Sequence, residues 1–175
     1  MLLVLDLEAT CADDGSIGAD QMEIIEVGAV WASASGEALD TFQAFVRPVE
    51  RPSLTAFCMA LTGIVQASVD AAAPWPAVAG ALAAFARRHP GEAWGSWGGY
   101  DERQIGRDCA RHGVAHPLGG RRHRNIKSEF ARARSMRPVG MAEALALAGL
   151  DLQGRHHRAL DDALNLARLL PALQP

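Results

Sequence analysis

The spacing of hydrophobic and polar positions predicts strands in the first part of the chain. Leu2–Leu7 is almost wholly apolar, and Glu23–Ala32 and Asp40–Pro48 are runs typical of strands. Residues 33–37, SASGE, predict a hairpin turn between the second and third strands. A shorter run, Glu92–Gly98, predicts one more strand near the middle of the chain.

Helical periodicity dominates the rest of the chain. The predicted helices cover Leu54–Ile64, Pro74–His89, Asp101–Gly113, Met141–Leu150 and Arg158–Leu170. Gly63 and Gly113 end the first and the third, and Pro74 begins the second, as these residue types do at helix ends. The chain thus has three strands first and then helices that alternate with a further strand. This order indicates an α/β fold, with a mixed β-sheet flanked by helices.

Length and composition favour a single soluble domain over residues 1–175. A domain usually holds about 100–200 residues, and 49% hydrophobic with 21% charged residues is typical of globular proteins. No apolar run approaches the ~18 residues of a membrane span, and because Met1 leads straight into the first predicted strand we expect no secretory leader. Cys11, Cys58 and Cys109 lack the spacing of a zinc site or disulfide frame, so we expect reduced thiols and a cytoplasmic location.

Positive charge is concentrated in one segment, although the net charge is −3. The basic residues between positions 121 and 137 are Arg121, Arg122, Arg124, Lys127, Arg132, Arg134 and Arg137. Such a patch can follow a phosphate backbone. A solvated loop and helix face explains it as well and is the commoner case, so both interpretations stay open.

Two carboxylates interrupt the most hydrophobic predicted strand. Asp6 and Glu8 are two residues apart, so they project to the same face with Cα atoms about 6.5–7 Å apart. Carboxylates this close repel each other unless a proton or a cation intervenes. The alternative explanation is that Glu8 lies in solvent at the end of the strand and that Asp6 caps a turn. A metal site is favoured, because the strand is apolar on both faces and should be central.

The last predicted helix carries a third carboxylate on an apolar face. Asp162 shares that face with Leu166 and Leu169, where a charge needs a partner. The polar stripe of this helix, expected to face solvent, consists of Asp161, Asn165 and Arg168. An ion pair with an arginine is the alternative explanation for Asp162.

A fourth acid, Asp101, lines up with Ile105 and Cys109 on its predicted helix. An ordinary helix cap is an equally good explanation for it when it is taken alone. Taken together, four acids without cysteine ligands favour Mg²⁺ or Mn²⁺ over zinc. Two such ions are the usual device for in-line attack on a phosphodiester.

A histidine precedes Asp162 in the segment GRHHRALDD. His157 lies just before the last predicted helix, a position that suits a general base with a pKa near neutral. His156 is the alternative, since one histidine of the pair is expected to be an ordinary surface residue. Spacing alone does not choose between them.

These residues resemble the DEDDh class of 3′–5′ exonucleases, of the RNase H-like superfamily. DLEATC is similar to the first motif of that class, WGGYDERQIGRDC to the second and HHRALDDALNLAR to the third. The third has the form His, four residues, Asp, which selects His157 with Asp162. The stretch from FVRPVERP through FCMALTGI, together with NIKSEFARA, is similar to the Eri/KapD-like branch.

The resemblance implies a metal-dependent enzyme with two Mg²⁺ or Mn²⁺ ions held by Asp6, Glu8, Asp101 and Asp162. It would remove nucleoside 5′-monophosphates from the 3′ end of single-stranded RNA or DNA, with RNA favoured by the branch. Leu61 and Thr62 would border the terminal nucleotide, with Leu61 as a wedge, and backbone near Ala9 would approach the 3′-hydroxyl. A proofreading-type DNA exonuclease and a non-catalytic nucleic-acid-binding module are the alternatives.

Overall fold

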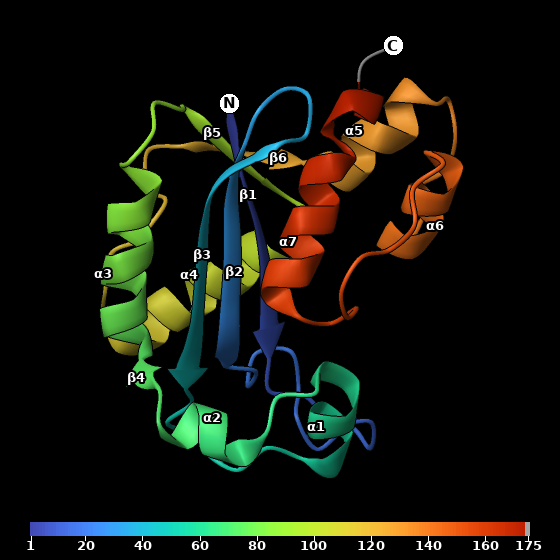
Figure 1. Ribbon diagram of the computed structural model, residues 1–175. Coiled ribbons are helices and arrows are strands. Elements are labelled where there is room, and N and C mark those ends of the chain that lie inside the picture. The colour runs from blue at the N-terminus through green and yellow to red at the C-terminus, as the bar shows by residue number, and fades with distance from the viewer. Residues whose placement is uncertain (174–175) are drawn as a thin grey trace.

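A six-stranded mixed sheet forms the centre of the computed structural model, which describes residues 1–173 (Figure 1). The strands are β1 (Leu2–Ala9), β2 (Ile24–Ala32), β3 (Ala38–Arg47), β4 (Ala73–Pro74), β5 (Ala93–Ser96) and β6 (Arg122–Asn125). They lie in the order β4-β3-β2-β1-β5-β6. β1 is central, antiparallel to β2 and parallel to β5.

Helices cover both faces of the sheet. They are α1 (Ala56–Thr62), α2 (Gln66–Asp70), α3 (Trp75–Ala86), α4 (Tyr100–His112), α5 (Ile126–Ala133), α6 (Met141–Leu147), α7 (Ala159–Arg168) and the 3₁₀ turn Leu170–Leu173. In Figure 1, α3 and α4 lie on one side of the strands and α5, α6 and α7 on the other, while α1 and α2 lie beyond the end of β1. Within residues 1–173, no helix has the length and apolar character needed to cross a bilayer.

The alternation of β1 assigns its side chains to two separate cores. Leu3, Leu5 and Leu7 are buried in a cluster that includes residues of α3 and α4. Leu2 and Val4 are buried in another, with residues of α5, α6 and α7. Because side chains two apart share a face, Asp6 and Glu8 continue the second row. The acids therefore point toward the α7 side of the sheet.

The predicted α/β fold with a mixed sheet is confirmed, and the predicted hairpin is present, with Ser33 N donating to Glu37 O at 2.9 Å. The prediction missed α2, α5 and the strands β4 and β6. β6 has the sequence RHRN, which contains no apolar residue. It pairs with β5 through its backbone, so its strand conformation comes from tertiary contact and leaves no hydrophobic pattern.

A glycine lets α7 approach the sheet closely. Gly28 of β2 lies opposite Asp6 of β1, and a Cβ atom built on it would be 2.1 Å from the backbone carbon of Ala159. No side chain fits in that space. The first turn of α7 therefore rests directly on β2, and this brings Asp162, three residues after Ala159, beside β1.

We expect Gly28→Ala to lower the melting temperature by about 2–12 °C, because overpacking against rigid backbone costs about 1–3 kcal/mol. Gly80→Ala is the matched control, since Gly80 lies within α3 with no atom within 4 Å of its built Cβ. That change should stabilise the helix by about 1 kcal/mol. Thermal unfolding followed by circular dichroism measures both, and equal melting temperatures would contradict the close approach.

Candidate active site

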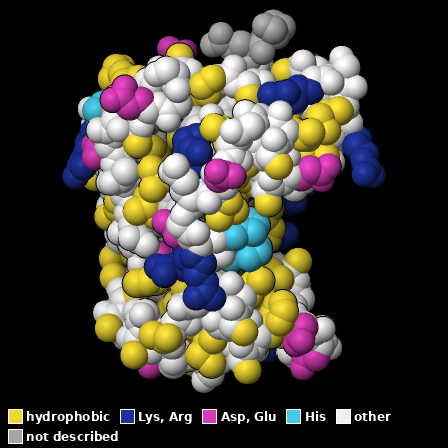
Figure 2. Space-filling view, turned by 45° about the vertical axis from the view of Figure 1, so that its right-hand side comes forward, with side chains coloured by type: hydrophobic (Ala, Val, Ile, Leu, Met, Phe, Trp, Pro, Cys, Tyr) yellow, Lys and Arg dark blue, Asp and Glu magenta, His cyan; other side chains and the backbone are white. Residues whose placement is uncertain are grey.

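A cleft of about 400 Å³ opens beyond the carboxyl end of β1. Its lining comprises Asp6, Leu7, Glu8, Ala9, Cys11, Met22, Leu61, Trp97, Tyr100, Asp101, Met141, His156, His157 and Asp162. Figure 2 shows histidine side chains at the edge of an indentation in the outline of the molecule, next to Lys and Arg side chains. The cleft thus gathers all four predicted acids and both candidate histidines.

Three of the acids form a tight group. Ligand oxygens of Asp6, Glu8 and Asp162 all lie within 4.8 Å of one another. Glu8 is 8% exposed and Asp162 is 3% exposed, so water screens this group poorly. Asp101, in the first turn of α4, is also buried and contributes to the same cleft.

Burial raises the pKa values of Asp6, Glu8 and Asp101, and the charges of neighbouring acids add to this effect for Asp6 and Glu8. Burial, followed by the charges of Asp162 and Glu26, raises the pKa of Glu8 to about 8. Burial and then the charge of Asp101 raise the pKa of Asp6 well above its ordinary value. Burial also raises the pKa of Asp101, to about 6. In the metal-free protein Asp6 and Glu8 therefore resist full ionisation at neutral pH.

This donor set fits hard divalent cations. Carboxylate oxygens are the ligands that Mg²⁺ and Mn²⁺ prefer, and a bound cation would remove the repulsion that raises these pKa values. A second set, consisting of His156, His157 and Asp162, shares one carboxylate with the first. The oxygen-only set is the better match for Mg²⁺ or Mn²⁺.

We expect Mn²⁺ binding to release protons at about pH 7 and to tighten as the pH rises to about 8. The reason is that Glu8, with a pKa of about 8, is mostly protonated at neutral pH and must lose its proton to bind a cation. Calorimetry in buffers of different ionisation enthalpy measures the protons released. An affinity that stays constant between about pH 6 and pH 8 would contradict the raised pKa.

A buried acid absent from the sequence prediction holds the start of α7. Glu26 of β2 is fully buried and accepts from Arg158 Nε at 3.0 Å and Arg158 Nη2 at 2.9 Å. It also accepts from the backbone N–H of Ala159 at 3.1 Å. This pairing fixes the residue that directly follows His157. Glu26 interrupts an apolar strand as Asp6 does, so the same signal could have revealed it.

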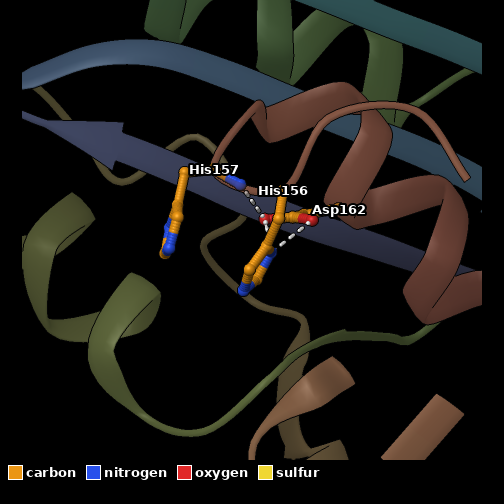
Figure 3. A group of neighbouring side chains, drawn as sticks. All are labelled: His156, His157 and Asp162. Atoms are coloured by element: carbon orange, nitrogen blue, oxygen red, sulfur yellow. Dashed lines mark hydrogen bonds and ion pairs between the residues drawn. The ribbon is translucent and has the colours of Figure 1, made fainter. Parts of the chain in front are cut away.

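The two histidines differ in their relation to Asp162 (Figure 3). The ring of His156 places Nδ1 3.0 Å from both carboxylate oxygens, whereas His157 donates only its backbone N–H, at 3.0 Å. The two rings stack with centroids 4.1 Å apart, and the His157 ring lines the cleft without a hydrogen bond to Asp162. His157 has φ 64°, a left-handed conformation that is uncommon outside glycine and is often found at functional sites.

The residues predicted to bind substrate occupy different environments. Leu61 and Ala9 line the cleft. Thr62 is fully buried, and its hydroxyl donates to Cys58 O at 2.8 Å and accepts from Ile64 N at 3.1 Å. Its side chain therefore supports the turn after α1, behind Leu61, and a contact between Thr62 and a nucleotide stays a prediction.

The predicted solvent-facing stripe of the last helix is wrong. Asn165 is fully buried and exchanges two hydrogen bonds with the backbone of Gln153. Asp161 accepts from the backbone N–H of Arg155 at 2.8 Å. The loop before α7 folds over this face, and its backbone groups need partners. Asp161 thus holds the loop, while Asp162 faces the cleft.

The basic segment serves partly as structure. Arg121 donates to Gly91 O and Ala86 O, and Arg124 forms an ion pair with Glu129. The exposed members of the segment are Arg122, Arg132, Arg134 and Arg137. Contact between these exposed residues and a phosphate backbone stays a prediction.

Comparison with known proteins gives consistent results. The profile of the exonuclease family RNase_T matches residues 3–170. The Homo sapiens ERI1 exoribonuclease 2 is 30% identical, over 96% of this chain and 27% of its own length. The Mus musculus 3′-5′ exoribonuclease 1 is 30% identical, over 96% of this chain and 51% of its own length. The chain thus spans only about a quarter to a half of these relatives.

Solved structures of the same kind superimpose closely. The nuclease domain of 3′hExo, a DEDDh family member bound to rAMP, has a TM-score of 0.86 and 27% identity and covers 96% of this chain and 88% of that chain. A 3′-exonuclease structure concerned with 3′-end-specific recognition of a histone mRNA stem-loop has a TM-score of 0.88 and 27% identity. The match covers 97% of this chain and 63% of that chain.

Proposed function

The chain belongs to the RNase_T exonuclease family, and we propose that it is a metal-dependent 3′–5′ exonuclease acting on single-stranded RNA. One observation carries the proposal: four carboxylates and the His157 ring converge on one cleft in a chain that the family profile matches over residues 3–170. The products are nucleoside 5′-monophosphates, released one at a time from the 3′ end.

The acids of the cleft hold two Mg²⁺ or Mn²⁺ ions in this proposal. Asp6 would be the ligand common to both ions, because its carboxylate lies within 4.8 Å of those of Glu8 and Asp162 and Asp101 is the acid that raises its pKa most. When bound, such a pair of cations makes a water molecule more acidic and offsets the charge on the leaving oxygen.

His157 takes the proton from the attacking water. Burial and then the neighbouring His156 lower the pKa of His157, against the charge of Asp162, and this favours the neutral imidazole that a base requires. Leu61 on α1 borders the terminal nucleotide, and the backbone at Ala9 approaches the 3′-hydroxyl.

The names of the relatives support RNA as the substrate. Both curated relatives are called exoribonucleases, and one structural neighbour holds rAMP. Because all four acids and the histidine are present in the cleft, hydrolysis is favoured over a non-catalytic binding role. A cytoplasmic location stays a prediction from the sequence. Matched RNA and DNA oligomers, incubated with the protein and Mn²⁺, compare the two substrates directly.

We expect a 5′-labelled RNA oligomer to shorten stepwise from its 3′ end, and an oligomer ending in a 3′-phosphate to resist. The phosphate should block the reaction because the site receives a free 3′-hydroxyl near Ala9. Gel analysis gives the ladder of products, and chromatography identifies the released nucleotides. Internal cuts, or products that carry a 3′-phosphate, would rule out this mechanism.

A further inference from the structure

A chain of hydrogen bonds through three side chains runs from the surface to the buried end of β5. Glu102 Oε2 lies 3.0 Å from His123 Nδ1, and His123 Nε2 lies 2.9 Å from Ser96 Oγ. The Glu102 side chain is 52% exposed and that of His123 is 9% exposed, while Ser96 is fully buried. The three residues come from α4, β6 and β5, so only the folded protein assembles them.

The order acid, imidazole, serine is that of a nucleophilic hydrolase, but burial excludes this chemistry here. Ser96 has an exposure of 0%, so no substrate can reach its hydroxyl. The hydroxyl instead donates to Gly98 O at 3.1 Å, across the turn that leads from β5 into α4. The hydrogen-bonded chain therefore holds the turn that leads to Asp101.

Ser96, the last residue of β5, closes the turn that leads into α4. Asp101 lies in the first turn of α4. The N-cap of this helix is Gly99, which has no side chain that could cap the first turn. The position of this turn therefore depends on contacts from neighbouring elements. Ser96 thus acts on Asp101 through the turn, by its hydrogen bond to Gly98 O.

His123 holds Ser96 from the edge of the sheet. It lies beside Trp94 in the register of β5 and β6, and the two rings pack with centroids 4.4 Å apart and planes at 48°. Trp94 is itself part of the buried core. With one face against Trp94 and Nδ1 bound by Glu102, the imidazole has one orientation, which directs Nε2 to Ser96.

We propose that His123 is a positioning residue for Asp101: by holding Ser96 Oγ through Nε2, it fixes the turn that carries this carboxylate into the cleft. This role rests on the proposed function, in which Asp101 helps to hold the cations. Groups that support metal ligands in this way typically affect metal affinity by about 10–100-fold. The segment 121–137 thereby acquires a role that comes from its histidine and not from its positive charge.

The test compares Mn²⁺ affinities by calorimetry with AMP present, so that no turnover is involved. His123→Phe keeps an aromatic ring against Trp94 but removes both hydrogen bonds, and we expect it to weaken Mn²⁺ binding about 10–100-fold. His123→Gln keeps groups that can donate and accept, so it should restore most of the affinity. Ser96→Ala removes only the hydroxyl and should reproduce the loss.

The matched control is His116→Phe. His116 also packs on Trp94, with centroids 6.3 Å apart, but its Nδ1 accepts from Leu118 N and not from Ser96. The His116→Phe variant should bind Mn²⁺ with the affinity of the wild type. Wild-type affinity in both His123→Phe and Ser96→Ala, or an equal loss in His123→Phe and His123→Gln, would overturn the role of His123. A wild-type protein that neither binds Mn²⁺ nor shortens RNA would overturn the proposed function instead.

Discussion

The Asp6→Asn variant is expected to lose hydrolysis almost completely, while its metal-free form melts at a higher temperature than the wild type. Asp6 lies within 4.8 Å of Glu8 and Asp162, at the centre of the acidic group. An amide cannot replace it as the anionic ligand shared by two cations. Because such cations contribute several kcal/mol of charge stabilisation, we expect a loss of at least about 10³-fold in kcat.

The gain in stability follows from the same repulsion. The pKa of Asp6 is raised well above its ordinary value by burial and then by Asp101, and that of Glu8 is raised to about 8. Carboxyl groups that ionise less readily in the folded chain cost stability once the pH exceeds their unfolded pKa of about 4. The metal-free wild type should therefore lose stability as the pH rises through the folded pKa values. Asp6→Asn should melt about 2–8 °C higher at about pH 8 and much less so at about pH 4.

Asp161→Asn is the matched control for this prediction. Asp161 accepts from Arg155 N through Oδ2, and an asparagine side-chain oxygen can accept in the same way. This variant should keep most of its activity and its wild-type melting curve. Saturating Mn²⁺ should raise the melting temperature of the wild type and of Asp161→Asn but not that of Asp6→Asn. A metal-free Asp6→Asn protein less stable than the wild type would show that the acids do not repel one another as described.

The sequence revealed the acids of the cleft because each interrupts a hydrophobic pattern. Asp6 and Glu8 follow Leu2 and Val4 on one face of a buried strand, and burial there makes a carboxylate conspicuous. Glu26 carries the same signal, but its partner Arg158 is 132 positions away along the chain. A pattern along the chain shows that such a group needs a partner and does not identify the partner.

Contacts between distant segments account for what the sequence could not predict. His123 and Ser96 are 27 positions apart, and neither interrupts a hydrophobic pattern. β6 becomes a strand only by pairing with β5. Asn165 has the spacing of a solvent-facing residue, yet the loop before α7 covers it. In each case the neighbour that decides the structure comes from another element.

The His157→Ala variant is expected to lose about 10²–10⁴-fold in kcat, the usual cost of a lost general base, while it still binds Mn²⁺. The His157 ring makes no hydrogen bond to Asp162, so its removal leaves the oxygen ligands in place. Because burial and His156 lower the pKa of His157, wild-type activity at saturating Mn²⁺ should rise with pH through a midpoint below about 6.5. Neutral imidazole accepts the proton, so activity falls on the acid side.

Two further variants separate the missing base from other effects. His157→Asn tolerates the left-handed backbone at φ 64° better than alanine and should lose the same activity, which excludes backbone strain as the cause. His156→Ala removes the ring that contacts both oxygens of Asp162, and it should be far milder in kcat, since that ring is not the base. If His156→Ala is the crippled variant and His157→Ala turns over normally, the general base is the imidazole bound to Asp162, and the motif register of the last helix is wrong.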